Sequence, residues 1–224
     1  MTQRLICLVI GYVCGLFQTG YIVGKAKGID IREHGSGNAG TTNILRTMGI
    51  KYAGIVLLGD AVKCGVAILI TRLIYQASHA DILPLLFLYA SFGAILGHNF
   101  PFYMNFKGGK GIAATAGFIL FGLSPVMTLV GIVVFFSVFF LTHYVSLGSI
   151  LLYFALAVCS VVFMMTDFYG WTAQGAGNLY REYIGVILVM LILMLVRHKE
   201  NIKRLINGNE RKTYLKQRPE IEVK

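Results

Sequence analysis

Seven stretches dominated by apolar side chains make up most of this sequence, and they constrain its fold more than any other feature. A helix needs about 20 apolar residues to cross the hydrocarbon core of a bilayer. Charged residues form only 13% of the chain, whereas a soluble domain carries about 25%. An ordinary soluble domain is therefore excluded, and we predict an all-α polytopic integral membrane protein with a single membrane domain over residues 1–224. The expected spans are residues 5–23, 52–75, 82–97, 111–123, 125–141, 146–165 and 183–196.

The fourth stretch has only 13 residues, so it fits a short or tilted helix, or a re-entrant segment that crosses part of the bilayer. Lys and Arg residues near span ends concentrate on the cytoplasmic side. With seven crossings, 16 of the 20 Lys and Arg residues lie on one face and two on the other. Six crossings would divide the basic loops between both faces. We therefore predict seven transmembrane helices, an extracytoplasmic N-terminus and a basic cytoplasmic tail over residues 197–224.

The net charge of +10 suits an anionic membrane surface, a phosphorylated substrate or a nucleic acid. Because the basic residues gather on one membrane face, we expect the lipid bilayer and phosphorylated substrates as partners, and no nucleic acid. The four cysteines (Cys7, Cys14, Cys64 and Cys159) all lie within apolar stretches. They lack the close spacing of a metal site, so we expect no metal and no cofactor.

The segment GSGNAGTTNILR, residues 35–46, joins the first two predicted spans and is rich in glycine and small polar residues. Its glycines permit backbone conformations in which successive N–H groups bind an anion, and an arginine can add a bidentate phosphate contact. The alternative is a flexible turn, but the interleaving of polar residues with an arginine favours a phosphate site. The candidate residues are Gly35, Ser36, Gly37, Asn38, Gly40, Thr41, Asn43 and Arg46.

The segment GHNFPFYMNFKGGKG, residues 97–111, leads into the fourth stretch. The N-terminus of a helix favours a bound phosphate, and a lysine adds a full charge. The segment is not a nucleotide-binding P-loop, because a glycine stands where that motif needs a hydroxyl. The candidate residues are Lys107, Gly108, Gly109, Lys110 and Gly111. His98 is either a base or a proton donor, or a structural residue.

Two further pairs of candidates lie at the same face. Ser146 and Ser149 are one helical turn apart at the start of the sixth span, where helix capping by Ser146 is the simpler alternative. His198 and Asn201 lie three residues apart at the end of the seventh span, which places them on one helical face. The basic residues around them could equally bind the cytoplasmic leaflet.

Asp60 and Lys63 lie one turn apart inside the second span, where an unpaired charge is costly. We expect them to form an ion pair with a structural or site-orienting role. A proton relay is the alternative, but relays usually need more than one such group.

Together these segments resemble the acyl-phosphate:glycerol-3-phosphate acyltransferases of bacteria, the PlsY family. The resemblance rests on GSGNAGTTNILR, GHNFPFYMNFKGGKG, YVSLGS, RHKENIKRLINGNE and the pair of charges in the second span. These segments run in family order over residues 35–210. The departures are the pair Cys64 and Gly65, Ala114, and a longer outer loop at residues 163–182, and none of them touches the candidate site.

The resemblance implies transfer of a fatty acyl group from acyl phosphate to the 1-hydroxyl of glycerol 3-phosphate. The products are 1-acyl-glycerol 3-phosphate (lysophosphatidic acid) and phosphate, in phospholipid synthesis at the bacterial inner membrane. The resemblance also implies seven spans, an active site facing the cytoplasm, and a soluble acyl-phosphate-forming enzyme as a partner. By the same match, the phosphates are bound by Ser36, Arg46, the glycine loop with Lys110, and Ser149. Activity also depends on His198 and Asn201, and structural integrity on Glu210.

An acyl phosphate is an activated mixed anhydride, so direct attack by the glycerol hydroxyl needs no covalent enzyme intermediate. Its proton then passes to a substrate phosphate, to His98 or to His198. The competing class is a carrier for organic phosphates, which should hold its site near the membrane midplane and often shows an internal repeat. Here the motifs lie at one face and no repeat is evident, and a membrane scaffold leaves both glycine-rich loops unexplained. The sequence therefore favours the enzyme.

Overall fold

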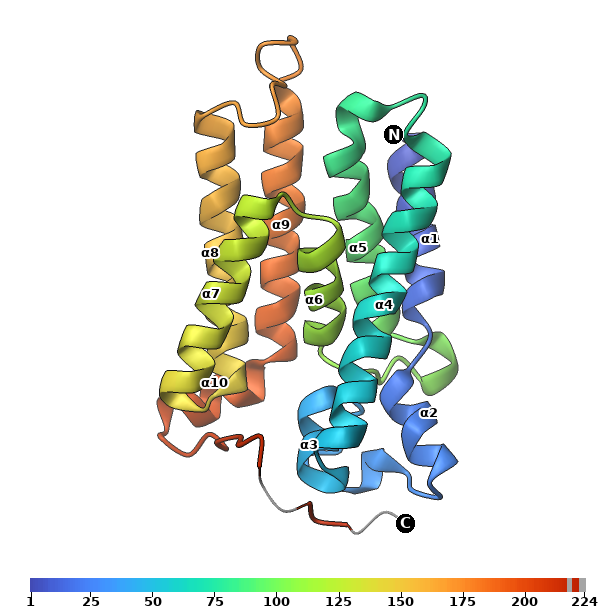
Figure 1. Cartoon of the computed structure of the whole chain (residues 1–224), viewed down its shortest axis with the longest axis vertical. Helices are drawn as coiled ribbons and strands as arrows, with labels where there is room; N and C mark the ends of the chain where they lie inside the picture. The colour runs from blue at the N-terminus through green and yellow to red at the C-terminus, as the bar shows by residue number, and fades with distance from the viewer. Residues whose placement is uncertain (217–218, 222–224) are drawn as a thin grey trace.

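The computed structural model describes residues 1–216 and 219–221, which contain helices, turns and loops but no strand. Figure 1 shows the helices running along one common axis, with a smaller group of helices at the end opposite the N-terminus. The α-helices are α1 (Thr2–Gly15), α2 (Thr19–Ala26), α3 (Thr41–Met48), α4 (Ile50–Tyr75), α5 (Leu83–Asn99), α6 (Ile112–Phe121), α7 (Pro125–Thr142), α8 (Val145–Met165), α9 (Asn178–Arg197) and α10 (Lys199–Ile206).

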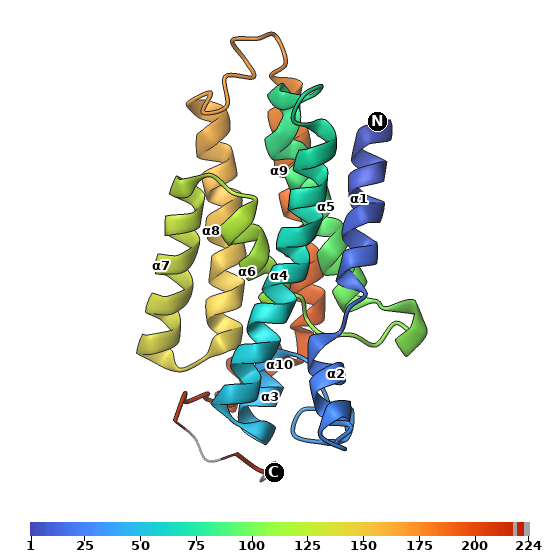
Figure 2. The same ribbon diagram turned by 45° about the vertical axis from the view of Figure 1, so that its right-hand side comes forward.

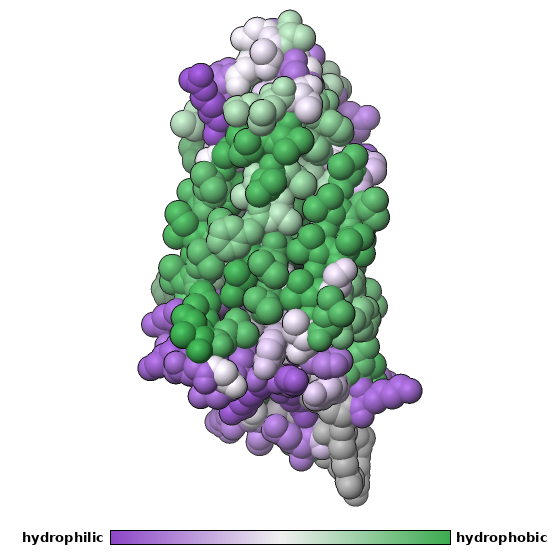
Figure 3. All heavy atoms as spheres, turned by 90° about the vertical axis from the view of Figure 1, so that its left-hand side faces the viewer, coloured by the Kyte–Doolittle hydropathy of each residue, from purple (hydrophilic) through white to green (hydrophobic). Residues whose placement is uncertain are grey.

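Six segments of the described chain are long and apolar enough to cross a bilayer. Figure 3 shows, on the face turned to the viewer, a hydrophobic band across the middle of the molecule and hydrophilic residues at both ends. Such a large exposed apolar surface suits lipid rather than water. The prediction of an all-α polytopic integral membrane protein is therefore confirmed. The six segments are Thr2–Ala26, Ile50–Tyr75, Ala80–Met104, Pro125–Thr142, Val145–Met165 and Asn178–Arg197.

The fourth predicted span corresponds to α6, which has only 10 residues. Its length of about 15 Å is half of the roughly 30 Å hydrocarbon core. Figures 1 and 2 show α5 and α7 running in the same direction, with α6 returning the chain between them. The reversal of the chain at α6 is what an odd number of membrane crossings requires. The count of seven transmembrane helices remains a prediction.

The first predicted span is two helices rather than one, because α1 ends at Gly15 and α2 begins at Thr19. The Lys63 ammonium of α4 donates a hydrogen bond to the Phe17 carbonyl over 2.7 Å. The Gln18 side chain donates to the His98 carbonyl of α5 over 3.1 Å. Both contacts come from residues distant in the sequence, so the break is fixed by packing.

The helices α1 and α5 approach so closely that glycine is required between them. A Cβ at Gly11 would lie 1.9 Å from the Ala90 carbonyl oxygen, and one at Gly93 would lie 2.1 Å from the Leu8 carbonyl oxygen. Small residues allow helix backbones in membranes to pack in direct van der Waals contact. This packing fixes the end of α5, which leads into the second glycine-rich loop.

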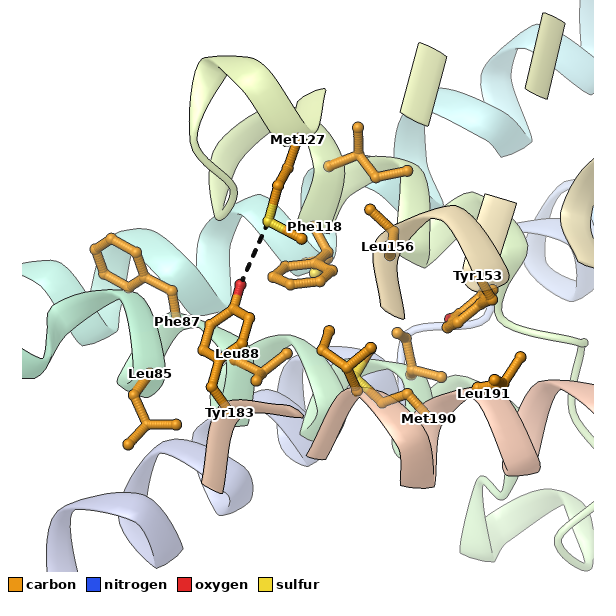
Figure 4. Packing of buried hydrophobic residues seen from close by; sticks show 14 of the residues in the cluster. Leu85, Phe87, Leu88, Phe118, Met127, Tyr153, Leu156, Tyr183, Met190 and Leu191 are labelled. Atoms are coloured by element: carbon orange, nitrogen blue, oxygen red, sulfur yellow. Dashed lines mark hydrogen bonds between the residues drawn. The ribbon is translucent and has the colours of Figure 1, made fainter. Parts of the chain in front are cut away.

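The main hydrophobic core lies between α5, α6, α8 and α9 and is shown in Figure 4. Leu88, Phe118 and Leu156 are fully buried there. The Tyr183 hydroxyl lies 4.0 Å from the Met127 sulfur, the contact drawn in Figure 4. This core joins α9, which carries the tail motif at its end, to α6, which begins at the second glycine-rich loop.

The end of the bundle that holds the N-terminus is closed by its own contacts. The Arg4 guanidinium of α1 makes a bidentate ion pair with Glu182 of α9, and the Tyr89 hydroxyl of α5 donates to the same carboxylate. The buried Trp171 indole donates to the Asp81 carbonyl over 2.8 Å. This end therefore has a structural network separate from the motifs at the opposite end.

Candidate functional site

The sequence motifs meet at one end of the bundle, which we call the basic end. It comprises α2, α3, α10, the loops at residues 27–40 and 100–111, and the tail after α10, as Figure 1 shows. Part of the predicted tail, residues 217, 218 and 222–224, lies outside the described residues. The predicted site residues of the two glycine-rich segments and of the tail therefore share one end of the molecule.

The first motif forms a folded turn followed by α3, and Asn43 shapes it. The Asn43 carboxamide oxygen accepts from the Ser36 N–H over 2.7 Å, and its nitrogen donates to the His34 carbonyl over 3.0 Å. Gly35 has φ +59°, and a Cβ there would lie 2.3 Å from the Asn43 carboxamide oxygen. The Asn43 amide is thus committed to the loop and does not point a free donor at a ligand.

The side chains around this turn differ in the hydrogen-bonding groups that they leave available to a ligand. The Asn38 carboxamide accepts from the Gly40 N–H over 2.9 Å, and Gly37 adopts φ +70°. Ser36 is exposed. The buried Thr41 hydroxyl has no hydrogen-bond partner within the described part of the chain. The loop therefore presents the Ser36 side chain outward on a turn held by asparagine side chains.

The second motif packs directly onto the end of α5. The Gly108 N–H donates to the Asn99 carbonyl and the Gly109 N–H to the His98 carbonyl, each over 3.1 Å. These two N–H groups are therefore occupied, although the sequence suggested that they bind phosphate. A Cβ at Gly109 would lie 2.0 Å from the His98 Nε2 atom, so only glycine fits against this ring.

The carbonyl side of the same loop is held by Arg197, the last residue of α9. Its guanidinium donates to the Gly108 and Gly109 carbonyl oxygens over 2.9 and 2.8 Å. Exposed Lys107 lies on one side of these two glycines. On the other side, Gly111 adopts φ +86° immediately before the first turn of α6. The loop is thus clamped between α5 and α9, which fixes where Lys110 points.

A carboxylate hub, formed by Glu210 and its partners, lies beside Lys110. The Lys110 ammonium donates to the Asn201 carboxamide oxygen, and the Asn201 amide nitrogen donates to Glu210 over 2.6 Å. Glu210 also accepts from Arg204 over 2.7 Å and from the Ser146 hydroxyl over 2.9 Å. The hub therefore joins α8, α10 and the glycine loop, and it orients the Asn201 amide toward Lys110.

Ionisation at the hub follows from these contacts. Burial raises the pKa of Glu210, but hydrogen bonds from Asn201, Arg204 and Ser146 outweigh burial and hold this pKa below its ordinary value. Burial lowers the pKa of Lys110 to about 8, although the Glu210 carboxylate opposes the change. At neutral pH the hub thus contains a carboxylate beside a lysine that remains mostly protonated.

Arg46 of α3 faces the tail beside this hub. Its guanidinium donates to the Thr213 hydroxyl over 2.7 Å and to the Arg211 carbonyl over 3.1 Å. Burial lowers the pKa of Arg46, but arginine stays protonated in proteins. Within residues 1–216 and 219–221, neither Arg46 nor Lys110 forms an ion pair with a carboxylate. Two half-buried cations therefore point into one region with neutral partners only.

The two candidate histidines differ in the ring atoms they leave available. The His98 Nδ1 atom lies 2.7 Å from the Lys63 ammonium, and its Nε2 atom packs against Gly109. The His198 Nδ1 atom donates to the Met194 carbonyl over 2.9 Å, which leaves Nε2 as the acceptor of the neutral ring. Burial and the nearby Lys110 ammonium lower the pKa of His198 to about 4. Both ring nitrogens of His98 therefore have close neighbours, Lys63 and Gly109, whereas the His198 Nε2 atom has no hydrogen bond to any residue that the structure describes.

Behind the site lies a buried ion cluster of Thr19, Asp60, Lys63 and His98. The predicted ion pair is present, with 2.8 Å between the Lys63 ammonium and Asp60 Oδ1. Thr19 donates to the same carboxylate over 3.0 Å. The Lys63 ammonium donates its three hydrogen bonds to Phe17, Asp60 and His98. The cluster therefore connects the break in the first span to the second motif.

The hydroxyls at the start of α8 have different partners. Ser146 reaches the hub, and α8 is preceded by Tyr144 as its N-cap, so helix capping does not explain this serine. Ser149 is fully buried and donates to the Val145 carbonyl of its own helix over 2.8 Å. The structure thus joins Ser146, Lys110, Asn201 and Glu210 directly, whereas no described contact joins Ser149 or Ser36 to them.

Sequence reasoning overlooked two residues that shape the site. Arg197 was counted only among the basic residues, although it holds the glycine loop. Thr213 carries no motif signal and is nevertheless buried against Arg46. Only the position of Arg197 as the first residue of the tail motif could have suggested its role.

Comparisons with known proteins show similarity to one family over most of the chain. A family model described as glycerol-3-phosphate acyltransferase matches residues 5–208. The chain is similar to the glycerol-3-phosphate acyltransferase of Bacillus subtilis (strain 168), with 40% identity over 207 residues, 92% of this chain and 95% of that protein. It is also similar to that of Clostridioides difficile (strain 630), with 37% identity over 211 residues, 93% of this chain and 94% of that protein.

Two solved structures are similar as well. One is a crystal structure of PlsY, an integral membrane glycerol 3-phosphate acyltransferase, in its glycerol 3-phosphate form. Its TM-score is 0.75 at 30% identity, with 94% of this chain and 96% of that chain covered. The lysophosphatidic acid form of PlsY gives a TM-score of 0.68 at 30% identity, with coverage of 95% and 96%.

Proposed function

The chain belongs to the glycerol-3-phosphate acyltransferase family, the PlsY family, and we propose that it uses acyl phosphate as the acyl donor. The fatty acyl group passes to the 1-hydroxyl of glycerol 3-phosphate, and the products are 1-acyl-glycerol 3-phosphate and inorganic phosphate. In this reaction the C–O bond of the mixed anhydride breaks, an ester forms, and phosphate leaves with the electron pair.

The observation that carries this proposal is the pair of cations, Arg46 and Lys110, whose bonded partners are neutral. A cation that forms no ion pair at contact distance attracts a phosphate strongly in a half-buried site. A reaction between two phosphorylated substrates needs positive charge for both. We assign Ser36, Arg46, Lys110 and Ser149 to phosphate binding.

Positioning and electrostatic stabilisation account for catalysis in this proposal. Acyl phosphate carries a good leaving group, so holding the glycerol hydroxyl against its carbonyl carbon lowers the barrier without a covalent enzyme intermediate. Each donor that stabilises charge developing on the carbonyl oxygen contributes roughly 3–4 kcal/mol. Asn201 and the ammonium of Lys110 are assigned to that region.

The hydroxyl proton goes to a substrate phosphate or to His198 rather than to His98. His198 supports this role because its Nε2 atom has no hydrogen bond to a described residue. His98 has its Nδ1 atom engaged by Lys63 and its Nε2 atom packed against Gly109. We therefore assign His98 to orienting the glycine loop.

We assign the basic end to the cytoplasmic side of the bacterial inner membrane, with the N-terminus outside. The support is the charge distribution, 16 of 20 Lys and Arg residues on one side of the predicted spans, since basic loops remain in the cytoplasm. A soluble enzyme that forms acyl phosphate would then deliver its product to the same side as glycerol 3-phosphate.

Turnover by the purified protein tests the proposal. We expect palmitoyl phosphate and glycerol 3-phosphate, with no metal added, to yield phosphate and lysophosphatidic acid. Ser36→Ala and Arg46→Ala should lose this activity. Gly54→Ala is the matched control, because a Cβ at Gly54 of α4 meets nothing within 4 Å.

The donor is tested in the same assay with palmitoyl-CoA and palmitoyl-acyl carrier protein in place of palmitoyl phosphate. No turnover with palmitoyl phosphate, or equal turnover with palmitoyl-CoA, contradicts the donor assignment. Retention of full activity in Arg46→Ala contradicts the assignment of this cation to a substrate phosphate.

A further inference from the structure

The chain after α10 folds back across the basic end as a C-terminal strap, residues 207–216 and 219–221. The reversal begins at Gly208, whose φ is +69°. The Gly208 N–H donates to the Leu205 carbonyl over 3.2 Å and the Asn209 N–H to the Arg204 carbonyl over 2.9 Å. Figure 1 shows this segment passing from α10 to the neighbourhood of α3. The match to the family model ends at residue 208, so nearly all of the strap lies beyond it.

One part of the strap is anchored to the turn between α7 and α8. The Thr213 N–H donates to the His143 carbonyl over 2.9 Å, and the ring centroids of His143 and Tyr214 lie 4.6 Å apart. Thr213 is 1% exposed. Its backbone position is therefore fixed by α7 and α8 and not by α3.

The other part of the strap is anchored to the end of α3. The Glu220 N–H donates to the Arg46 carbonyl over 3.0 Å, and the Ile221 N–H donates to the Thr47 carbonyl over 2.9 Å. The last carbonyls of a helix have no partner within the helix, so the strap satisfies two of them. The strap thereby connects α3 to the opposite side of the bundle.

At its first anchor the strap also holds the guanidinium of Arg46 in two hydrogen bonds. The acceptors are the Thr213 hydroxyl and the Arg211 carbonyl, and both are neutral. Neutral acceptors fix the direction of the guanidinium while leaving its positive charge available, whereas a carboxylate at the same place would compete with a substrate phosphate. The hydroxyl is the only one of the two acceptors that a side-chain substitution can remove.

We propose that Thr213 is a positioning residue for Arg46, through which the C-terminal strap sets the affinity of the site for glycerol 3-phosphate. This inference rests on the proposed assignment of Arg46 to phosphate binding. Thr213 acts through the guanidinium and does not touch the substrate.

Calorimetric titration of the purified full-length protein with glycerol 3-phosphate tests the inference. Thr213→Val keeps the shape of the side chain and removes the acceptor, so we expect its Kd to rise about tenfold. Thr213→Ser restores the hydroxyl and should stay within about twofold of the wild type. Thr172→Val, a threonine substitution in the loop at the opposite end of the bundle, is the matched control and should bind like the wild type.

A double-mutant cycle separates positioning from a structural effect. In an Arg46→Lys background the guanidinium is gone, so Thr213→Val should weaken binding no further. An equal weakening by Thr213→Val in both backgrounds overturns the inference, as does a Kd within about twofold of the wild type. Absence of glycerol 3-phosphate binding by the wild type also overturns it. Turnover tests the proposed function separately, because the titration contains no acyl donor.

Discussion

Replacing Lys63 by methionine removes the cation from the buried ion cluster and keeps a side chain of similar length. Three acceptors lose their donor at once: the Phe17 carbonyl at 2.7 Å, Asp60 at 2.8 Å and His98 at 2.7 Å. Asp60 is fully buried, and its Oδ2 atom already has no partner among the described residues. The variant therefore leaves an uncompensated charge inside the bundle.

The magnitude follows from this count. Removing one partner of a buried ion pair costs roughly 3–5 kcal/mol. For a chain of this size each kcal/mol lowers Tm by about 2–4 °C, so the expected fall is roughly 6–20 °C. Replacing both charges, as in Lys63→Met with Asp60→Leu, removes the stranded carboxylate and should recover most of this loss.

The cysteines provide the assay. Cys7 and Cys64 are both 0% exposed, so a thiol-reactive fluorophore labels them only when the bundle opens. The measurement uses detergent-solubilised protein in which the partly buried Cys14 and Cys159 are replaced by alanine. A Tm fall below about 2 °C in Lys63→Met refutes the reasoning, and so does a double variant no more stable than the single one.

Three further predictions concern the loop, the pH profile and the far end of the bundle. Gly109→Ala should reduce activity at least about tenfold, because its Cβ would lie 2.0 Å from His98 Nε2; equal activity in Gly109→Ala and the control Gly54→Ala would contradict the packing argument. The pKa of about 8 at Lys110 means that the charged form is lost as pH rises, so kcat/KM for glycerol 3-phosphate should fall above about pH 8. Lys110→Arg should remove this limb, since a guanidinium stays protonated, and a limb that persists in that variant excludes Lys110 as its source. Trp171→Phe loses one buried hydrogen bond to the loop between α4 and α5, which should lower Tm by about 2–4 °C with no change in turnover; a loss of turnover would mean that the two ends are coupled.

The sequence alone predicts where the helices lie, because each long apolar stretch must become a helix in a bilayer to satisfy its own backbone groups. The predicted span at residues 125–141 is observed as Pro125–Thr142, and the one at 146–165 as Val145–Met165. The pairing of Asp60 with Lys63 was also predictable, since residues three apart face each other on a helix and the pair is observed at 2.8 Å. These features depend on neighbours within one helix.

The break in the first span was decided by tertiary structure. Glycines recur along this segment without ending the helix, as at Gly11, and no proline lies near Phe17. The chain leaves the helix just before the Phe17 carbonyl, which accepts a hydrogen bond from Lys63 of α4. Tertiary structure also decided the partners of the Gly108 and Gly109 N–H groups, which donate to carbonyl oxygens at the end of α5. Apolar periodicity carries no information about such partners.

The candidate site shows the same division. Composition and spacing identified Arg46 and Lys110 as residues able to bind phosphate, because their chemical groups are visible in the sequence, and the family resemblance added Asn201 as a residue on which activity depends. Only the fold decided that Asn201 relays between Glu210 and Lys110, and that the strap fixes Arg46 through Thr213. The physical reason is that hydrogen-bond partners 91 or 167 residues apart in the chain meet only after the helices have packed.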